Sequence, residues 1–560
     1  MILQPVIDIA EICALKGVKK AIICPGSRNA PLTLAFARHE SIDCLSVPDE
    51  RSGAFIALGI ALKTKEPVVL ICTSGSAAYN FAPAVAEAFF LQIPLIVLTA
   101  DRPKEWIAQL DGQTIFQENI YGSHVKQSYS FPTDYSNNDV TWHCHRMVNE
   151  AINKSIEFPQ GPVHINIPLR EPFYPEKKEE FTYSQNLKTT DLEVFKHKGL
   201  DAVSSLNFDD YGRILIIAGQ AKFSHELNLL LSKLSKKFKI PILGDIIANL
   251  AEVQNIISAQ DLFLKQKSGN ADLKPELIIT YGKSVISKNL KLFLRGVKPA
   301  NHWHIQSSGD VADTFQSLTK VLRCNPFEFF THFLDNKKQI ADEEFFELWQ
   351  TTNAEAKTKL HELLHANDEF SEFKAFMLVM DSLPGHVDLH LANSMAVRYA
   401  NFIGLNKKKG IEVFANRGTS GIDGSVSTAI GAALSTEREV YLLIGDMAFF
   451  YDRNAFWQER LPSNLKIVVF NNHGGGIFRM IDGPSQQPEL NEFFETRQKL
   501  SAKHLAEEYN LSYKICDNFQ GLSEGIVHLE EASDTLSILE VETKSEVNER
   551  VFKKIIKAFG

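Results

Sequence analysis

The sequence lacks the paired cysteines, long apolar runs and signal segment that mark several specialised classes of protein. Its 560 residues contain only seven cysteines, scattered and without a CxxC pair, so neither a disulfide framework nor a zinc ribbon is predicted. No apolar run reaches the roughly 18 residues of a membrane span. The chain also does not open with a positively charged segment and a long apolar core, as a secretory signal would. We therefore expect a cytoplasmic protein with reduced thiols and no membrane span.

The sequence also lacks a surplus of positive charge. The formal net charge is −9 and no long basic run occurs, whereas a nucleic-acid-binding protein needs a basic surface to neutralise phosphates. Nucleic acid is therefore not an expected partner. The apolar share of 44% is that of an ordinary globular protein, and the length suits about three domains of ~150 residues each.

Buried strands alternate with helical patterns in three regions, which is the order of parallel α/β domains. Residues 54–62 and 77–91 have helical patterns, a polar stretch at 171–198 is interpreted as a linker, and 336–380 as a helical connection. The strands are predicted at 20–24, 68–72, 95–98, 213–220, 241–245, 277–282, 439–444 and 465–470. These patterns predict domains at 1–180, 195–335 and 365–560.

The first and last regions share a plan in which a Gly-Ser turn opens a helix of small residues. These turns are Gly75-Ser76 and Gly424-Ser425, and each helix leads into a buried strand. The shared plan suggests two related α/β domains.

The most informative pattern lies in the last region, where polar residues directly follow two buried strands. Asp446 follows one strand and Asn472 the next, with glycines at 474–476. Ligands bind at the carboxyl ends of strands in such sheets, and carboxylate, amide and carbonyl oxygens suit Mg²⁺. Taken singly, Asp446 is more often a helix cap and the asparagine a turn residue. Their order and spacing favour a metal site.

This pattern resembles the diphosphate and metal motif of thiamine-diphosphate enzymes, with Met447 standing where many members have a second glycine. The likeness extends to one branch of that superfamily, the 2-succinyl-5-enolpyruvyl-6-hydroxy-3-cyclohexene-1-carboxylate synthases of menaquinone biosynthesis. The segments that resemble this family are residues 25–32 (PGSRNAPL), 73–80, 99–103, 416–424 and 472–478. Because they are ordered over most of the chain, the set is far more specific than any one of its members.

The resemblance implies an α/β protein with three doubly wound parallel-sheet domains of the thiamine-diphosphate-binding fold. These are a pyrimidine-binding domain, a central Rossmann-like domain, and a domain that binds diphosphate and metal. It also implies a transferase that uses thiamine diphosphate and Mg²⁺, for which Mn²⁺ is an alternative. The metal ligands implied are Asp446, Asn472 and the carbonyl of Gly474.

Further cofactor contacts follow from the same resemblance. Glu50 is expected to contact N1′ of the aminopyrimidine and to start the deprotonation of the thiazolium ring. Taken alone, Glu50 is a helix-start carboxylate favoured by the helix dipole. Ile422 is expected to hold the cofactor in its bent form. The remaining expected contacts are Ser394, Arg417, Gly418, Ser420, Gly445, Met447, Ile477 and Phe478.

The substrates implied are 2-oxoglutarate and isochorismate, which together carry four carboxylates and therefore call for arginine and lysine. Ser394 and Arg398 are four residues apart, so on a helix they would share a face. Lys283 is an alternative to Lys288, and a surface ion pair is the alternative role of each arginine. The residues expected to act on the substrates with Glu50 are Ser27, Arg28, Arg102, Gln113, Lys288, Arg398 and Arg417.

The reaction implied is decarboxylation of 2-oxoglutarate and 1,4-addition of the succinyl semialdehyde carbanion to isochorismate. The products are 2-succinyl-5-enolpyruvyl-6-hydroxy-3-cyclohexene-1-carboxylate and CO₂. Members of the superfamily pair the pyrimidine domain of one subunit with the diphosphate domain of another. We therefore expect at least a homodimer, with a dimer of dimers as the larger alternative.

Other functions remain to be compared. An acetohydroxyacid synthase or 2-oxoacid decarboxylase of the same superfamily would share Glu50 and the metal motif but would give no reason for the arginines.

A P-loop at Gly282-Lys283-Ser284 lacks its first glycine, because residue 277 is leucine. Zinc at His143-Cys144-His145 or at the His302/His304 pair lacks the usual ligand spacing. No G-x-G-x-x-G occurs in the middle region, so flavin is not predicted. A non-enzymatic binding module would not need Glu50, Asp446 and Asn472 together.

Overall fold

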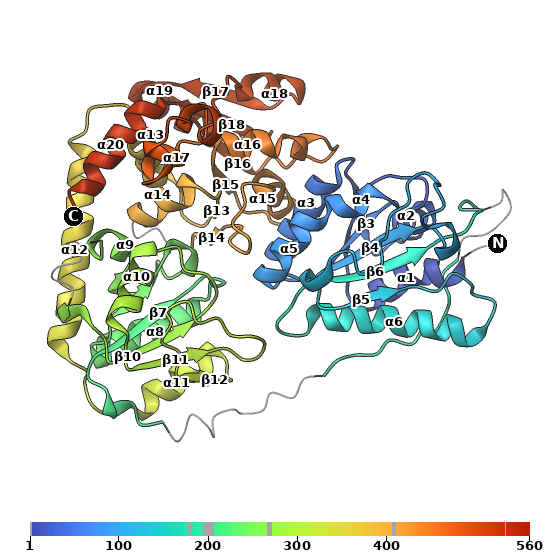
Figure 1. Ribbon diagram of the computed structural model, residues 1–560, viewed down its shortest axis with the longest axis horizontal. Helices are drawn as coiled ribbons and strands as arrows, with labels where there is room; N and C mark the ends of the chain where they lie inside the picture. Colours follow the sequence, from blue (N-terminus) through green and yellow to red (C-terminus); the bar gives the residue numbers. More distant parts are fainter. Residues whose placement is uncertain (1–2, 176–181, 194–205, 266–270, 406–409, 533) are drawn as a thin grey trace. The chain divides into compact units, whose positions relative to one another are not determined.

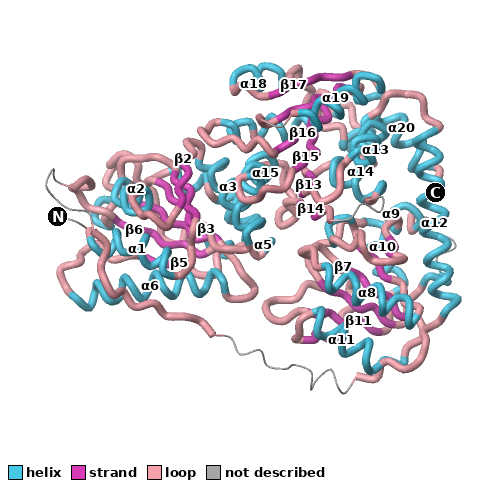
Figure 2. The backbone as a smooth tube through the Cα atoms, turned by 180° about the vertical axis from the view of Figure 1, so that it is seen from behind, coloured by secondary structure: helices cyan, strands magenta, loops and turns pink. Residues whose placement is uncertain are grey.

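The computed structural model describes residues 3–175, 182–193, 206–265, 271–405, 410–532 and 534–560. It contains three six-stranded sheets flanked by helices (Figure 1, Figure 2). The strand pairs whose register is described are all parallel. The predicted α/β class with three doubly wound sheets is confirmed. Among the described residues, none of the helices has the length and apolar character required to cross a membrane.

The first sheet has the strand order β2-β1-β3-β4-β6-β5. Its central strands are fully buried because helices cover both faces, which explains why they appear in the sequence as unbroken apolar runs. The strands are β1 (Lys20–Ile23), β2 (Asp43–Ser46), β3 (Val68–Cys72), β4 (Leu95–Asp101), β5 (Ser128–Ser130) and β6 (Val163–Pro168). The helices are α1 (Gln4–Leu15), α2 (Ala30–Ala37), α3 (Glu50–Thr64), α4 (Ser76–Asn80), α5 (Ala82–Leu91) and α6 (Asn138–Ile156).

Strands β1, β3 and β4 lie where the sequence predicts them, but one predicted helix is wrong in its extent. The pattern at 77–91 forms two helices, α4 and α5, which meet at Phe81. Pro83 stands in the first turn of α5, where its missing N–H is not needed, whereas within one continuous helix it would remove a hydrogen bond. Strands β2, β5 and β6 are not predicted, since β2 and β5 are short and polar and β6 buries His164 and Asn166.

The middle sheet has the order β12-β11-β10-β7-β8-β9, which in sequence terms is the 3-2-1-4-5-6 order of dinucleotide-binding folds read from its other edge. The predicted Rossmann-like arrangement is therefore present. The strands are β7 (Ile214–Ala218), β8 (Ile242–Gly244), β9 (Ile256–Ile257), β10 (Leu277–Tyr281), β11 (Asn301–Ile305) and β12 (Lys320–Leu322). The helices are α8 (His225–Phe238), α9 (Gln260–Phe263), α10 (Lys288–Val297) and α11 (Pro326–Asn336).

The third sheet has the order β14-β13-β15-β16-β18-β17, which repeats the order of the first sheet strand for strand. This identity of topology supports the two related domains suggested by the Gly-Ser turns. The strands are β13 (Asp388–Leu391), β14 (Glu412–Phe414), β15 (Val440–Gly445), β16 (Leu465–Asn471), β17 (Ser512–Cys516) and β18 (Ser537–Glu542). The helices are α12 (Glu343–His365), α13 (Glu372–Ser382), α14 (Met395–Ile403), α15 (Ser425–Ala433), α16 (Asp446–Tyr451), α17 (Ile477–Met480), α18 (Ala502–Glu508), α19 (Phe519–Glu531) and α20 (Ser545–Lys557).

Helices α3 and α15 cross at very close range, although one comes from the N-terminal and one from the C-terminal part of the chain. A Cβ on Gly59 would lie 2.1 Å from the carbonyl oxygen of Thr428, and one on Gly431 would lie 2.1 Å from that of Ile56. Only glycine permits such an approach of two backbones. Residues 416–437 and 448–465 accordingly form one compact unit with residues 1–195.

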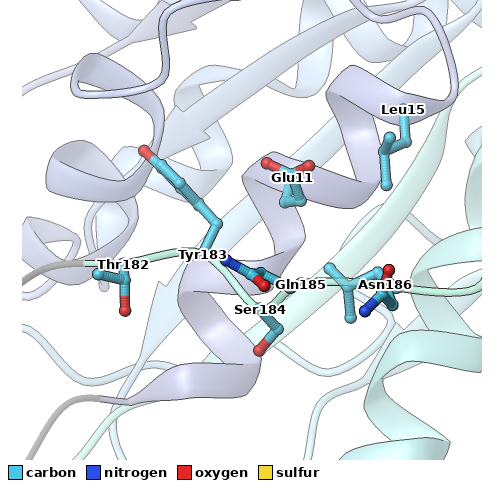
Figure 3. Close-up of a pocket in the computed structure, with 8 residues that line it drawn as sticks. Glu11, Leu15, Thr182, Tyr183, Ser184, Gln185 and Asn186 are labelled. Atoms are coloured by element: carbon cyan, nitrogen blue, oxygen red, sulfur yellow. The ribbon is translucent and has the colours of Figure 1, made fainter.

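The polar stretch after β6 packs against the first sheet domain beyond the predicted boundary at 180. Tyr183 donates a hydrogen bond from its hydroxyl to the Ala35 carbonyl at 2.7 Å, and the amide of Thr190 donates to Asn149 Oδ1 at 2.9 Å. Figure 3 shows residues 182–186 running past α1, where they line a surface hollow of about 750 Å³. This hollow contains none of the predicted site residues. Residues 176–181 and 194–198 of the predicted linker lie outside the described residues.

Candidate active site

The carboxyl ends of β15 and β16, which are neighbours in the third sheet, bring together the predicted metal ligands. Asp446 directly follows β15 and is 2% exposed, and Asn472 directly follows β16 and is 9% exposed. Gln498 donates a hydrogen bond from Nε2 to Asp446 Oδ2 at 2.7 Å. Burial raises the pKa of Asp446 to about 6, although hydrogen bonds from Gln498 and from the amides of Met447 and Gly474 act in the other direction. A cation would favour the charged form of this carboxyl group.

Asn472 presents an oxygen that the protein itself does not satisfy. Its Nδ2 donates to Glu372 Oε2 at 2.7 Å, while its Oδ1 is buried and has no hydrogen-bond partner among the described residues. A buried polar atom without a partner is costly unless something else binds it. Burial also raises the pKa of Glu372 to about 7, with the charge of Asp446 adding to the effect. The buried Asp446 carboxyl and the unsatisfied Asn472 oxygen fit a hard divalent cation such as Mg²⁺, and Glu372 lies behind Asn472.

The glycine loop after Asn472 is held by a buried ion pair. The amide of Gly475 donates to the Glu495 carbonyl at 2.6 Å, and the Glu495 carboxylate accepts from Arg479 at 2.7 and 2.8 Å. Burial alone would raise the pKa of Glu495, but hydrogen bonds from Arg479, Ser545 and Arg497 outweigh it and lower the pKa to about 2. The Gly474 carbonyl accepts from the Gly476 amide at 2.9 Å and keeps a second lone pair for a metal.

The same loop leads into α17, whose first residues are the predicted apolar contacts. Ile477 and Phe478 are half-buried, and the Phe478 ring packs against Phe494 with 5.8 Å between ring centroids. Arg479, on the same short helix, is 8% exposed and bonded to Glu495. The ion pair therefore anchors α17 and leaves Ile477 and Phe478 partly open.

The start of α14 also lies at this edge of the third sheet, because α14 follows β13, the neighbour of β15. Ser394 is the residue before the helix, with φ of 71°, and the Arg398 guanidinium donates to its carbonyl oxygen. Both side chains are half-buried. The predicted pairing of Ser394 and Arg398 on one helix face is wrong in detail, since Ser394 is outside the helix and the contact runs through its backbone.

Lys288 is exposed at the first position of α10, after the carboxyl end of β10 in the middle sheet. The preceding turn is fixed by the buried carboxylate of Asp245, which accepts from the Ile286 amide and, at 3.1 Å, from that of Ser287. Asp245 also accepts from Asn401 of α14 at 3.2 Å, so one carboxylate joins the Lys288 turn to the helix that carries Arg398. Lys283 is exposed in the same connection, and the choice between the two lysines stays a prediction.

Glu50 is the first residue of α3, behind Asp49, whose side chain caps the helix by accepting from the Ser52 amide at 3.2 Å. The Asn80 side chain donates to Glu50 Oε2 at 3.3 Å. Burial raises the pKa of the Cys24 thiol, and the charge of Glu50 raises it further. The Glu50 carboxylate therefore lies near Cys24, the residue that follows β1. The half-buried Glu50 therefore stands at the carboxyl edge of the first sheet.

Two of the predicted arginines come together at this first edge. Arg28 is 7% exposed, donates to the Leu169 carbonyl at 2.7 Å, and lies over the Phe173 ring. Burial and then the charge of Arg102 lower the pKa of Arg28. Arg102 donates to the Gly112 carbonyl at 2.9 Å and pairs with Asp111 at 3.1 Å. The two guanidinium groups therefore repel each other, and an anion would relieve that repulsion.

The turns around these arginines are tightly packed. A Cβ on Gly26 would lie 2.3 Å from Cβ of Thr73, so the turn that carries Ser27 rests on the turn before α4. Gly75 has φ of 88° and packs against the backbone of Gln113. A Cβ on Gly75 would lie 3.3 Å from the Cα of Gln113. Ser27 and Gln113 are exposed. The turns that carry Ser27, Arg28, Arg102 and Gln113 thus lie at one edge of the first sheet.

A buried glutamate that the sequence does not single out holds the 417–422 loop. Glu87 of α5 is 1% exposed and accepts from the Gly418 amide at 2.8 Å, the Thr419 amide at 2.6 Å and the Thr419 hydroxyl at 2.6 Å. Arg417 is half-buried, Ser420 has φ of 64°, and Ile422 is 37% exposed. The loop thus presents an apolar side chain in the compact unit that also contains Glu50.

Comparison with known proteins agrees with this geometry. The description "Thiamine pyrophosphate enzyme, N-terminal TPP binding domain" matches residues 7–125, "Middle domain of thiamine pyrophosphate" matches 186–391, and "Thiamine pyrophosphate enzyme, C-terminal TPP binding domain" matches 394–541. The 2-succinyl-5-enolpyruvyl-6-hydroxy-3-cyclohexene-1-carboxylate synthase of Cytophaga hutchinsonii is 45% identical, with 99% of each chain covered. Enzymes of that name from Flavobacterium johnsoniae and Bacteroides thetaiotaomicron are 40% and 35% identical, with at least 97% of each chain covered. The chain belongs to this synthase family.

Membership in the synthase family confirms the predicted enzyme class and the predicted thiamine diphosphate cofactor. It does not favour the acetohydroxyacid synthase or decarboxylase alternative. Among the described residues no cluster of three or more histidine, cysteine or acidic side chains is arranged to hold a metal. The roles of individual site residues stay predictions, and so does the cytoplasmic location.

Sequence reasoning missed the residues that support the site rather than line it. Glu372, Gln498, Glu495, Asp245 and Glu87 are all held in place by hydrogen bonds to the predicted residues or to their loops. No local motif marks them. Their only signal in the sequence is an acidic or amide residue at the edge of an apolar segment, which many surface residues share.

Proposed function

We propose that this chain decarboxylates 2-oxoglutarate and adds the resulting four-carbon unit to isochorismate, with thiamine diphosphate and Mg²⁺ bound. The observation that carries the proposal is that Asp446 and Asn472, with its unsatisfied Oδ1, follow the ends of two adjacent strands. It occurs in a chain that matches the synthase of Cytophaga hutchinsonii over 99% of both lengths. Mn²⁺, which accepts the same oxygen ligands, is the expected substitute.

The cofactor, when bound, supplies a site that accepts the electrons released by decarboxylation. The protein's task is to bind, orient and exclude water. Asp446, Asn472 and the Gly474 carbonyl would hold the metal and through it the diphosphate. The Glu50 carboxyl would share a proton with the aminopyrimidine ring, and Ile422, which is 37% exposed, would offer an apolar support.

We assign substrate recognition to arginine and lysine side chains, because the two substrates together carry four carboxylates. Arg28 and Arg102 at the first sheet edge repel each other without an anion, so a carboxylate between them gains from both. Arg398, Arg417 and Lys288 supply the remaining positive charge, with Ser27 and Gln113 as polar contacts. An acetohydroxyacid synthase, whose substrates carry fewer carboxylates, would not need this set.

The assembly is proposed to be at least a homodimer, with a dimer of dimers as the larger alternative. Glu50 and Asp446 follow strands of different sheets, and both are needed for one cofactor. Size-exclusion chromatography with light scattering would show the assembly, and a fully active monomer would contradict it.

The decisive assay mixes the protein with thiamine diphosphate, Mg²⁺, 2-oxoglutarate and isochorismate, and follows the loss of isochorismate absorbance. We expect loss only when all four components are present. If isochorismate persists while CO₂ is released from pyruvate or another 2-oxoacid, the cofactor assignment stands but the substrate assignment is wrong. Failure to bind thiamine diphosphate in the presence of Mg²⁺ would favour a non-enzymatic binding module.

A further inference from the structure

Glu372 lies beside the proposed metal site but is not one of its ligands. It is the first residue of α13 and is 4% exposed. Its Oε2 accepts hydrogen bonds from Asn472 Nδ2 at 2.7 Å and from Asn548 Nδ2 at 3.2 Å. Its own amide donates to Asn548 Oδ1 at 2.8 Å, so the glutamate is clamped at both its backbone and its side chain.

The direction of the bond between Glu372 and Asn472 follows from their chemistry. Glu372 Oε2 faces the NH₂ groups of both Asn472 and Asn548, so this oxygen acts as an acceptor even when the other carboxyl oxygen carries a proton, whereas a carboxamide has one donating and one accepting end. Asn472 must therefore turn its NH₂ group toward Glu372, and its Oδ1 faces elsewhere, buried and without a hydrogen-bond partner among the described residues. If the amide were flipped, two oxygens would face each other at hydrogen-bond distance, and the metal would meet an NH₂ group that cannot bind it.

We infer that Glu372 is a positioning residue of the metal centre, which fixes the orientation of the Asn472 amide so that Oδ1 is presented to the divalent cation. This inference rests on the metal site proposed above. Groups that orient metal ligands commonly matter about 10–100-fold for metal affinity. Asp446 has a comparable support in Gln498, whose NH₂ group donates to its Oδ2.

The glutamate's position also shows why a neutral acceptor should suffice. The hydrogen bond to Asn472 needs an acceptor at the place of Oε2, and the amide oxygen of glutamine can occupy it. Leucine at 372 would keep the apolar volume but remove the acceptor, so the Asn472 amide would be free to flip. Orientation and charge can therefore be tested separately at this one position.

The test measures Mn²⁺ binding in the presence of thiamine diphosphate, from the loss of the electron paramagnetic resonance signal of free Mn²⁺. We expect Glu372→Leu to weaken Mn²⁺ binding about 10–100-fold and Glu372→Gln to change it by no more than roughly threefold. Glu343→Gln is the matched control, because Glu343 is the first residue of α12 and is exposed. Circular dichroism confirms that each variant is folded.

A reversal of the hydrogen bond gives a second, independent measurement. Asn472→Asp alone would set a carboxylate against Glu372 and should weaken Mn²⁺ binding. Asn472→Asp combined with Glu372→Gln restores a donor facing an acceptor, and should bind Mn²⁺ at least about tenfold more tightly than the single variant. A residue with a merely structural role would not produce this rescue.

The outcomes distinguish a failure of the role inferred for Glu372 from a failure of the proposed metal site. If the unaltered protein does not retain Mn²⁺, the metal site itself is wrong. If the unaltered protein and folded Glu372→Leu bind Mn²⁺ equally, only the role of Glu372 is overturned. The same holds if the double variant binds no better than Asn472→Asp. Should Glu372→Leu fail to fold, the comparison of the double variant with Asn472→Asp decides.

Discussion

Replacing Gly59 with alanine puts a methyl group where α3 touches α15. The methyl carbon would lie 2.1 Å from the Thr428 carbonyl oxygen and 3.0 Å from the Ala432 amide nitrogen, well inside the 3.4 Å at which ordinary contact begins. Both neighbours are backbone atoms, so relief requires the helices to separate. Overpacking of this kind costs about 1–3 kcal/mol, and the better helix propensity of alanine returns up to ~1 kcal/mol. We expect a net loss of stability of about 1–2 kcal/mol.

Gly296→Ala is the matched control, because Gly296 lies in α10 and an added methyl group there meets no atom within 4 Å. It should be neutral or slightly stabilising. The assay is urea and thermal unfolding at a fixed scan rate, together with the affinity for thiamine diphosphate. Affinity should fall in Gly59→Ala alone, since α3 begins at Glu50 and α15 follows the Ile422 loop. If Gly59→Ala and Gly296→Ala have the same unfolding midpoints in urea and on heating, the close crossing of α3 and α15 is wrong.

Three further predictions concern the site. Glu495→Gln should destabilise the protein by about 1.5–3 kcal/mol at pH 7, because Arg479 loses the charge of its buried partner and keeps only the more exposed Glu546 and Glu549. The folded pKa near 2 lies below the ordinary 4.5, so this stabilisation is complete above pH 4.5 and lost as pH falls toward 2. Urea midpoints of both proteins should therefore converge in acid, and a constant difference would contradict the pairing. Asp446→Asn should weaken Mn²⁺ binding, measured by equilibrium dialysis, by at least about tenfold, and unchanged binding would remove Asp446 from the site. Arg102→Ala should raise the KM of a carboxylate substrate about tenfold or more with a smaller change in kcat, and an effect on kcat alone would place Arg102 elsewhere.

The site residues that follow strand ends could be predicted because their signal is local. Asp446 and Asn472 each directly follow an apolar run, and the turn with Arg28 follows β1 in the same way. A run of buried β-branched residues that stops at a polar residue marks the edge of a parallel sheet, wherever in space that sheet lies. The helix break at Phe81 could also have been predicted, since Pro83 was visible in the sequence.

By itself the sequence determined the α/β class and the cofactor family, and it predicted which residues would face the cofactor and substrates. Only the tertiary structure decided which buried groups support them. Glu372 bonds to a residue 100 positions away, and Glu87 to a loop 331 positions away. A buried carboxylate must find donors wherever the fold supplies them, because leaving it unpaired is costly. Those donors come from elements distant in the chain, so no local pattern records the pairing.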